Sequence, residues 1–394
     1  MAGLGFRNNY LRERVEGEEA RVDFSELFFD LVFVFAVTQI SHYLLHHLNA
    51  LGLAQAAFLV LAIWWVWVYT TWATNWLDPH RRPVRLMLFI MMLAGLFLST
   101  SIPEAFGERG LVFATAYVVM QVGRCLFMLM ALRHHSPGNF RNFQRITTWL
   151  ATAGVFWIAG GLADDPTARF LWWIAAMVIE LTAPAVGYRL PGLGASTTRD
   201  WDVDGGHMAE RCGLFVIISL GESILIAGAT FTELGWSLSH TLAFISCFVA
   251  TVAMWWIYFN IGAEVSRERI AESDDPGRIA RFAYTYVHIA IIAGIIVVAV
   301  GVELVLAHPL GLHAGIPVIL TLIGGAALYL AGNGFFKFLT FGRWPLSHLL
   351  GLAAFAVLGG TAYFVPPLAV AGEIAVILAA VAIWEFISLR SLRH

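Results

Sequence analysis

Two stretches of this sequence decide its fold: RVDFSELFFDLVFVFAVTQIS at residues 21–41 and ERCGLFVIISLGESILIAGATF at residues 210–231. Each is apolar and long enough to cross a lipid bilayer. Each also carries an acid and a threonine with the same spacing, namely Asp30 with Thr38 and Glu222 with Thr230. A charged side chain at the centre of a membrane helix costs about 2.5–3.5 kcal/mol on insertion scales. Because both halves carry such a costly acid at matched positions, the sequence predicts an internal repeat in which these acids have a function.

The composition indicates an all-α polytopic membrane protein. Hydrophobic residues make up 59% of the chain and charged residues 13%, whereas soluble domains are about 25% charged. The mean hydropathy is +0.73. The net charge of −3 gives no reason to expect a nucleic-acid partner. The three cysteines have no paired spacing, and we expect neither disulfides nor a cysteine metal site.

About twelve membrane-spanning helices are predicted, in two parallel repeats of six. A polar segment at 1–23 precedes the first repeat at 24–189, a linker at 190–207 joins it to the second repeat at 208–389, and a short tail ends the chain at 390–394. The predicted spans are 24–46, 54–77, 84–105, 110–132, 143–163, 167–189, 208–231, 239–262, 281–305, 315–338, 345–365 and 368–389. An even number of helices per repeat gives both repeats the same orientation, as in parallel-repeat transporters.

The distribution of arginine predicts the orientation in the membrane. If the N-terminus is cytoplasmic, most of the loop arginines fall on that side, and only Arg109 and Arg169 fall on the other. This asymmetry is typical of cytoplasmic loops. Lysine occurs once, at Lys337, in a chain rich in Ala, Gly and Val, which favours a GC-rich bacterial genome. We therefore expect a bacterial inner-membrane protein with both termini in the cytoplasm.

Further polar residues match between the two halves. The matches pair Tyr117, Gln121 and Arg124 with Tyr329, Asn333 and Lys337, and Glu180 with Glu385. Intramembrane carboxylates are typical of proton relays and ion sites. The predicted pathway for an ion, proton or substrate consists of Asp30, Glu222, Glu180, Thr38 and Thr230. Its predicted charge and amide partners are Arg21, Arg124, Arg211, Lys337, Gln121 and Asn333.

Two ion pairs are expected from the depths of these residues, one between Asp30 and Arg124 and one between Glu222 and Lys337. Glu180 has no evident basic partner at its depth. Glu222 is the deepest carboxylate, and we expect it to titrate during function. The alternative is that the charged residues only lock helices together, since buried polar groups also stabilise helix packing.

Two other groups have a structural and a functional interpretation. The tryptophans Trp64, Trp65, Trp255 and Trp256 lie deeper than the interfacial belt, where they either pack between helices or form the wall of a solute cavity. Glu26 is expected to reach the interface or pair with Arg21, and His207 to cap its helix or join an Arg211 network.

No phosphate loop, catalytic nucleophile or zinc motif occurs in the chain. The sequence therefore predicts no enzyme, no metal and no cofactor.

The first-helix motif at 21–41, together with His207-x-x-Glu210-Arg211 and Leu220-Gly221-Glu222-Ser223, resembles the bacterial low temperature requirement protein A family. The resemblance covers nearly the whole chain and implies a polytopic membrane protein. The segment Arg21–Glu26 is also similar to a signature of the two-repeat lysosomal potassium channels and their bacterial relatives. It is one residue shorter here, with Glu in place of Asp, and the second half has no Phe-Ser-acid triplet.

Two functions remain open from the sequence. The first is a transporter or channel-like protein that moves a monovalent cation, a proton or a small solute past intramembrane carboxylates. The second is a membrane protein without transport activity, such as a lipid-binding protein, an enzyme or a sensor in cold or envelope stress adaptation. The lipid bilayer is the one partner that both functions share, and the sequence leaves the oligomeric state undecided.

Overall fold

The computed structural model describes residues 9–12, 21–196, 204–260 and 281–389 of the chain. These residues form helices and contain no named strand; the two β contacts are isolated bridges, Leu11 with Leu77 and Leu190 with Gly194. The expected all-α class is therefore confirmed. The predicted tail and most of the polar N-terminal segment lie outside the described residues.

The described part of the chain contains eleven helices that are long and apolar enough to cross a membrane. The helix α6 (Pro137–Leu162) has 26 residues and a polar beginning and is not among these eleven. Eleven spans agree with the expected number of about twelve. The helix α6 starts before the predicted span at 143–163, because Pro137 occupies its first turn, where proline is well tolerated. The polytopic membrane class is thus confirmed.

The chain divides into two compact units. Unit 1 comprises residues 1–39 and 62–208, and unit 2 comprises residues 40–61 and 209–394. The boundaries fall inside three helices, α1 (Phe24–His46), α2 (Ala50–Trp76) and α8 (Gly205–Leu234), so each of them contributes residues to both units. Each unit is described by itself below.

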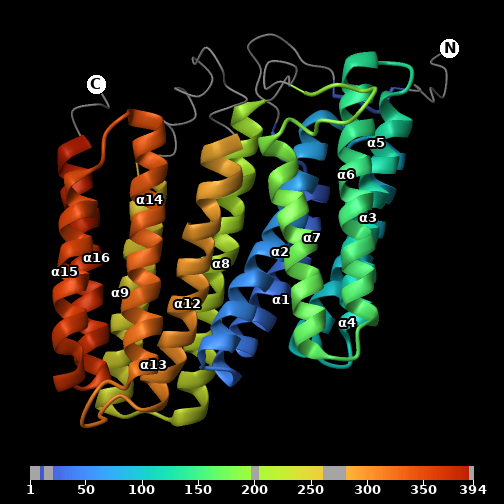
Figure 1. Ribbon diagram of the computed structural model, residues 1–394. Helices are drawn as coiled ribbons and strands as arrows, with labels where there is room; N and C mark the ends of the chain where they lie inside the picture. The colour runs from blue at the N-terminus through green and yellow to red at the C-terminus, as the bar shows by residue number, and fades with distance from the viewer. Residues whose placement is uncertain (1–8, 13–20, 197–203, 261–280, 390–394) are drawn as a thin grey trace. The chain divides into compact units, whose positions relative to one another are not determined.

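Unit 1 contains the larger part of the first half of the chain. Besides its shares of α1, α2 and α8, it consists of α3 (Arg82–Ser101), α4 (Gly110–Val118), η2 (Val119–Gly123), α5 (Arg124–Leu132), α6 and α7 (Pro166–Ala185). The main packing joins α6 with α7 and α4 with both α3 and α6 (Figure 1). The side chain of Asp165 caps the start of α7 by accepting a hydrogen bond from the amide of Ala168.

Unit 2 contains the remaining helices. These are α9 (Leu238–Phe259), η4 (Arg281–Val287), α12 (His288–Ala307), α13 (Ile316–Val318), η5 (Ile319–Gly324), α14 (Gly325–Phe341), α15 (Leu346–Thr361) and α16 (Pro367–Leu389). The helix α12 packs on α14, and α9 packs on α16 (Figure 1). Gly294 and Gly325 allow the first of these contacts, because a Cβ atom on either would meet the backbone of the other helix within 3.0 Å.

Within the part of the chain that the structure describes, three membrane helices contain a π-helical turn that the sequence did not predict. In unit 1 the turn is η2, which joins α4 to α5. In unit 2 the turns are η5, which leads into α14, and η4, which leads into α12. Such turns add a residue to the helix and frequently occur at functional sites. In unit 1 the turn lies inside the segment that carries Tyr117, Gln121 and Arg124.

Candidate functional site

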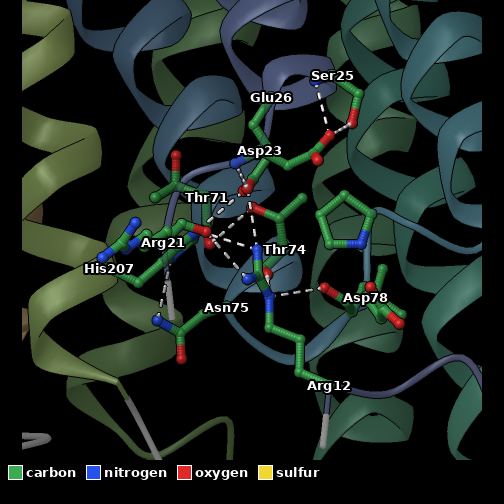
Figure 2. Close-up of polar contacts among 12 residues, drawn as sticks. Arg12, Arg21, Asp23, Ser25, Glu26, Thr71, Thr74, Asn75, Asp78 and His207 are labelled. Carbon is green, nitrogen blue, oxygen red and sulfur yellow. Dashed lines mark hydrogen bonds and ion pairs between the residues drawn. The ribbon is translucent and has the colours of Figure 1, made fainter. Parts of the chain in front are cut away.

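A cluster of buried charges lies in unit 1 where α1 begins and α2 ends (Figure 2). Its organising side chain is Arg12. The Arg12 Nε donates to the carbonyls of Thr74 at 2.9 Å and Leu77 at 3.0 Å. These carbonyls belong to the end of α2, where helical partners run out and the helix dipole favours a cation. Arg12 therefore caps α2 from a segment that precedes α1.

Glu26 is the anion of this cluster, and it is fully buried in the first turn of α1. Its Oε2 accepts from Arg12 Nη2 at 2.9 Å and from the amide of Asp23 at 3.0 Å. Its Oε1 accepts from His207 Nε2 at 2.9 Å. The Arg21 side chain is exposed, and its carbonyl accepts from Arg12.

Asn75 holds His207 in one orientation. The Asn75 amide clamps the backbone of Asp204, donating to its carbonyl at 2.8 Å and accepting from its amide at 3.0 Å. The Nδ2 of Asn75, a donor, lies 3.3 Å from His207 Nδ1, so Nδ1 accepts. Its Nε2 lies 2.9 Å from Glu26 Oε1 and 3.3 Å from Arg12 Nη2. The side chain of His207 thus lies among Glu26, Arg12 and Asn75.

Asp23 lies just before α1 and makes contacts outside the membrane-spanning segment. Its carboxylate accepts from the amide and hydroxyl of Ser25, and His80 lies 3.5 Å away. Burial acts to raise the pKa of Asp23. The hydrogen bonds from Ser25 and the charges of His80 and Arg85 act in the opposite direction and prevail, so the pKa is lowered from 3.8.

Asp30 lies one turn further along α1 on the same face as Glu26, and it is 1% exposed. Its Oδ1 accepts from the indole Nε1 of Trp67 in α2 at 2.8 Å. Thr38, expected in the same pathway, is half-buried, and its hydroxyl donates to the Val34 carbonyl within α1.

A second cluster of unit 1 surrounds Glu180 in α7, which is 1% exposed. The Glu180 Oε2 accepts from the hydroxyl of Tyr117 at 2.9 Å and from Gln121 Nε2 at 2.8 Å. Its Oε1 accepts from the indole of Trp157 at 2.8 Å. Three donors thus hold one carboxylate, and Tyr117 and Gln121 were both matched to the repeat in the sequence.

The side-chain amide of Gln121 lies between Arg124 and Glu180. The Arg124 Nη2 donates to Gln121 Oε1, and its Nη1 donates to the Thr70 hydroxyl at 3.1 Å and the Val66 carbonyl at 3.3 Å. Arg124 therefore does not form the predicted ion pair with Asp30. This prediction was wrong. Gln121 links the two charges, because it accepts from Arg124 and donates to Glu180.

Unit 2 has its own buried cluster around Glu385 in α16. Lys337 Nζ donates to Glu385 Oε2 at 2.6 Å and to the Ile257 carbonyl at 3.1 Å. His348 Nδ1 lies 3.3 Å from Glu385 Oε1, and its Nε2 lies 3.0 Å from Asn333 Oδ1. Lys337 thus pairs with Glu385 and not with Glu222, which corrects the second predicted ion pair.

The contacts of the two bases correspond within their units. Arg124 donates to the carbonyl of Val66, the residue that directly follows Trp64-Trp65. Lys337 donates to the carbonyl of Ile257, the residue that directly follows Trp255-Trp256. In the sequence, Arg124 matches Lys337, and Trp64-Trp65 matches Trp255-Trp256. The corresponding contacts therefore support our proposal that the chain contains an internal repeat of 24–189 and 208–389.

The other predicted site residues have different environments. Glu222 and Arg211 are buried in the unit 2 part of α8, and Thr230 is half-buried further along that helix. Trp64 and Trp65 are buried, but Trp255 and Trp256 are 46% and 43% exposed. Trp256 packs edge-to-face on Phe386 of α16, and Trp255 stacks on Phe259.

The sequence did not assign several residues of these clusters. Arg12 was counted only as a loop arginine, and Asn75, Trp157 and His348 were not selected. Asn75 and Trp157 had a usable signal, since each is a polar group within an otherwise apolar helix. Arg12 had none, because its partners depend on how the chain before α1 folds back. Within the described residues, no three His, Cys, Asp or Glu side chains are grouped as a metal site requires.

Comparison with known proteins identifies the family. The model of the bacterial low temperature requirement A protein family matches residues 21–383. The chain belongs to this family. It is also 41% identical over 380 residues, covering 96% of this chain and 92% of the other, to an uncharacterized protein of Rhizobium meliloti (strain 1021). No solved structure matches the chain. The family match includes Glu26, Asp30, Glu180, Arg124 and Lys337, whereas Arg12 lies before it and Glu385 lies after it.

Proposed function

We propose that this protein moves a cation across the bacterial inner membrane along buried polar groups of unit 1, with both of its termini in the cytoplasm. The observation that carries the proposal is the burial of Glu26, Asp30 and Glu180, which are 0–1% exposed in helices that can span a membrane. A bilayer makes such charges costly, and they commonly mark ion and proton pathways.

Polar groups connect these carboxylates within unit 1. Glu26 and Asp30 share a face of α1, and Asp30 is bonded to Trp67 of α2. The next turn of α2 provides Thr70, which accepts from Arg124. Arg124 is linked to Glu180 through Gln121. The polar groups therefore extend from the first turn of α1 to Glu180 in the last third of α7, and we propose that they form part of the route of the cation.

The test is charge movement in liposomes that contain the purified protein and carry an imposed membrane potential. We expect a voltage-sensitive dye to report a current that protein-free liposomes lack. Glu180→Gln should abolish this current, because it removes the charge and keeps the shape. The matched control is Glu373→Gln, which makes the same chemical change at an exposed carboxylate of α16. A folded wild-type protein without current would overturn the proposal.

A second candidate function, lipid binding without transport, is favoured by one observation. A groove of about 340 Å³ opens on the surface of unit 2 between α9 and α16, and Trp256, Ala253 and Phe386 are among its apolar lining residues. Bound lipid detected by native mass spectrometry, and lost when Ala253→Trp fills the groove, would support this function. It would replace the first candidate only if the current is absent.

A further inference from the structure

The hydrogen bonds around Glu180 discriminate between the cations that unit 1 could move. All three direct partners of the carboxylate are donors: the Tyr117 hydroxyl, the Gln121 amide and the Trp157 indole. Their hydrogens point at the lone pairs that a metal cation would use. Hard metal ions require several oxygen ligands around them, so a metal cation at Glu180 would have to displace these donors.

Two of the three donors cannot reverse their role. An indole has a hydrogen but no acceptor, so Trp157 always donates. The Gln121 amide is oriented by Arg124, which donates to its Oε1 and thereby turns its NH₂ group toward Glu180. The Tyr117 hydroxyl is different, because a hydroxyl both donates and accepts. Rotation about its C–O bond replaces the donated hydrogen by an oxygen lone pair.

We propose that Glu180 binds and releases a proton with Tyr117 as its reversible partner, and that the cation moved by unit 1 is a proton rather than a metal ion. The inference rests on the proposed function and names its substrate. On uptake, a proton from water adds to Glu180 Oε2 and forms an O–H bond, while the Tyr117 hydroxyl rotates and accepts from it. Trp157 continues to donate to Oε1. Release reverses these steps, and no electron is transferred.

The charges that face Glu180 allow both states. Among the described residues, its titratable neighbours are Arg124 and Cys125 from α5 and Tyr117 from α4, while α6 provides the uncharged Trp157. The Arg124 cation stands one amide away from the carboxylate and keeps its bonds to Thr70 and Val66 when Glu180 is neutral. Protonation of Glu180 therefore leaves no unbonded cation.

Glu385 in unit 2 provides the contrasting case. Its Oε2 lies 2.6 Å from the ammonium group of Lys337, and an ammonium group only donates. Lys337 therefore cannot become an acceptor for a protonated carboxyl group, as the Tyr117 hydroxyl can. Glu385 thus lacks the reversible partner that Glu180 has.

The first test is infrared difference spectroscopy of the whole protein in nanodiscs during a pH titration. We expect the carbonyl band of a protonated carboxylic acid to appear on acidification and to be missing in Glu180→Gln. Glu385→Gln should keep the band. If Glu180→Gln and the wild type have the same spectra, Glu180 does not take up a proton and the inference is overturned, whatever the liposomes show.

The second test compares ions and donors in the liposomes. We expect a trapped pH dye to report proton flux without potassium or sodium flux. Tyr117→Phe should reduce the proton flux about tenfold or more, since proton-transfer groups contribute at least that much. Trp157→Phe removes a one-way donor from the same carboxylate and should reduce the flux less.

The outcomes separate the two proposals. Potassium or sodium flux that Glu180→Gln abolishes would keep the proposed function and overturn the proton. No flux of any ion would overturn the proposed function, and the infrared band would still decide whether Glu180 exchanges a proton. Size-exclusion chromatography and thermal unfolding first show that Tyr117→Phe and Trp157→Phe are folded. Equal loss of proton flux in these two variants would then overturn the role of Tyr117.

Discussion

At the scale of single residues, different kinds of donor hold the four carboxylates Glu26, Asp30, Glu180 and Glu385. Glu26 has a guanidinium, an imidazole and an amide. Asp30 has an indole, Glu180 has three neutral donors, and Glu385 has an ammonium group. Because burial of a charge without partners is costly, the kind of donor decides whether the carboxylate is fixed or can change its protonation state.

Arg12→Gln should destabilise the protein strongly. The substitution removes the cation that faces Glu26, and breaking a buried pair in this way costs about 3–5 kcal/mol. It also removes the cap from α2. The thermal unfolding midpoint in detergent measures the effect. Arg133→Gln, a change at an exposed arginine, is the control and should leave the midpoint within error. Equal midpoints for both variants would show that the Arg12 contacts contribute nothing.

Asp23 should make stability depend on acid pH. Its pKa is lowered in the folded state. Its contribution to the free energy of unfolding is therefore fully present above about pH 4, the ordinary pKa range of an aspartate. This contribution is lost as the pH falls through the lower pKa of the folded state. Asp23→Asn keeps an acceptor for Ser25 and removes the charge. The wild type should therefore unfold at a higher temperature than the variant at pH 7, and the difference should shrink toward pH 3. A difference that is independent of pH contradicts this.

At the scale of helices, side chains from other segments bond the carbonyls at two helix ends. Arg12 serves α2, and Lys337 serves the carbonyl of Ile257 in the last turn of α9. Carbonyls at the end of a helix have no partner within it. In a bilayer no water replaces that partner, so the buried cations complete these two helices.

Lys337→Met should be more destabilising than the double substitution Lys337→Met with Glu385→Gln. The single change leaves a buried carboxylate without its cation, whereas the double change removes both charges. A double-mutant cycle on unfolding midpoints measures the coupling, which we expect at about 0.5–3 kcal/mol. Additive effects of the two single substitutions would mean that the pair contributes no interaction energy.

Asn75→Ala should loosen the start of α8. Asn75 makes two hydrogen bonds to the backbone of Asp204, and the alanine variant makes neither. Hydrogen exchange followed by mass spectrometry should show faster exchange in the peptide that contains Asp204 and His207. Thr71→Val is the matched control on α2, because the Thr71 hydroxyl donates only to the Trp67 carbonyl of its own helix. The same exchange rate in both variants would remove the role assigned to Asn75.

At the scale of the whole molecule, the number of spans makes a topological prediction. Twelve spans would place both termini on the same side, and the arginine distribution predicts that this side is the cytoplasm. Green fluorescent protein should therefore fluoresce when fused to either terminus, and alkaline phosphatase should be inactive there. A phosphatase fusion in the connection at 163–165, between α6 and α7, should be active. Phosphatase activity at one terminus would contradict an even number of spans.

The sequence predicted the helices better than the contacts between them. Hydropathy determines which segments cross the bilayer, and helical periodicity determines which residues share a face. Neither shows which two faces meet. Glu180, Gln121 and Lys337 were therefore selected correctly as buried polar residues, while Lys337 was assigned to Glu222. The true partner, Glu385, depends on the packing of α14 beside α15 and α16, which hydropathy does not encode.

The π-helical turn η2 also has a consequence for the comparison of relatives. An α-helix turns by about 100° per residue, and the wider turn at Val119–Gly123 changes the direction in which every later side chain of the helix points. The number of residues between Tyr117 and Arg124 is therefore part of the site, just as their identities are. In an alignment, a one-residue gap between these positions would mark a helix that presents a different face, and not a harmless change of length.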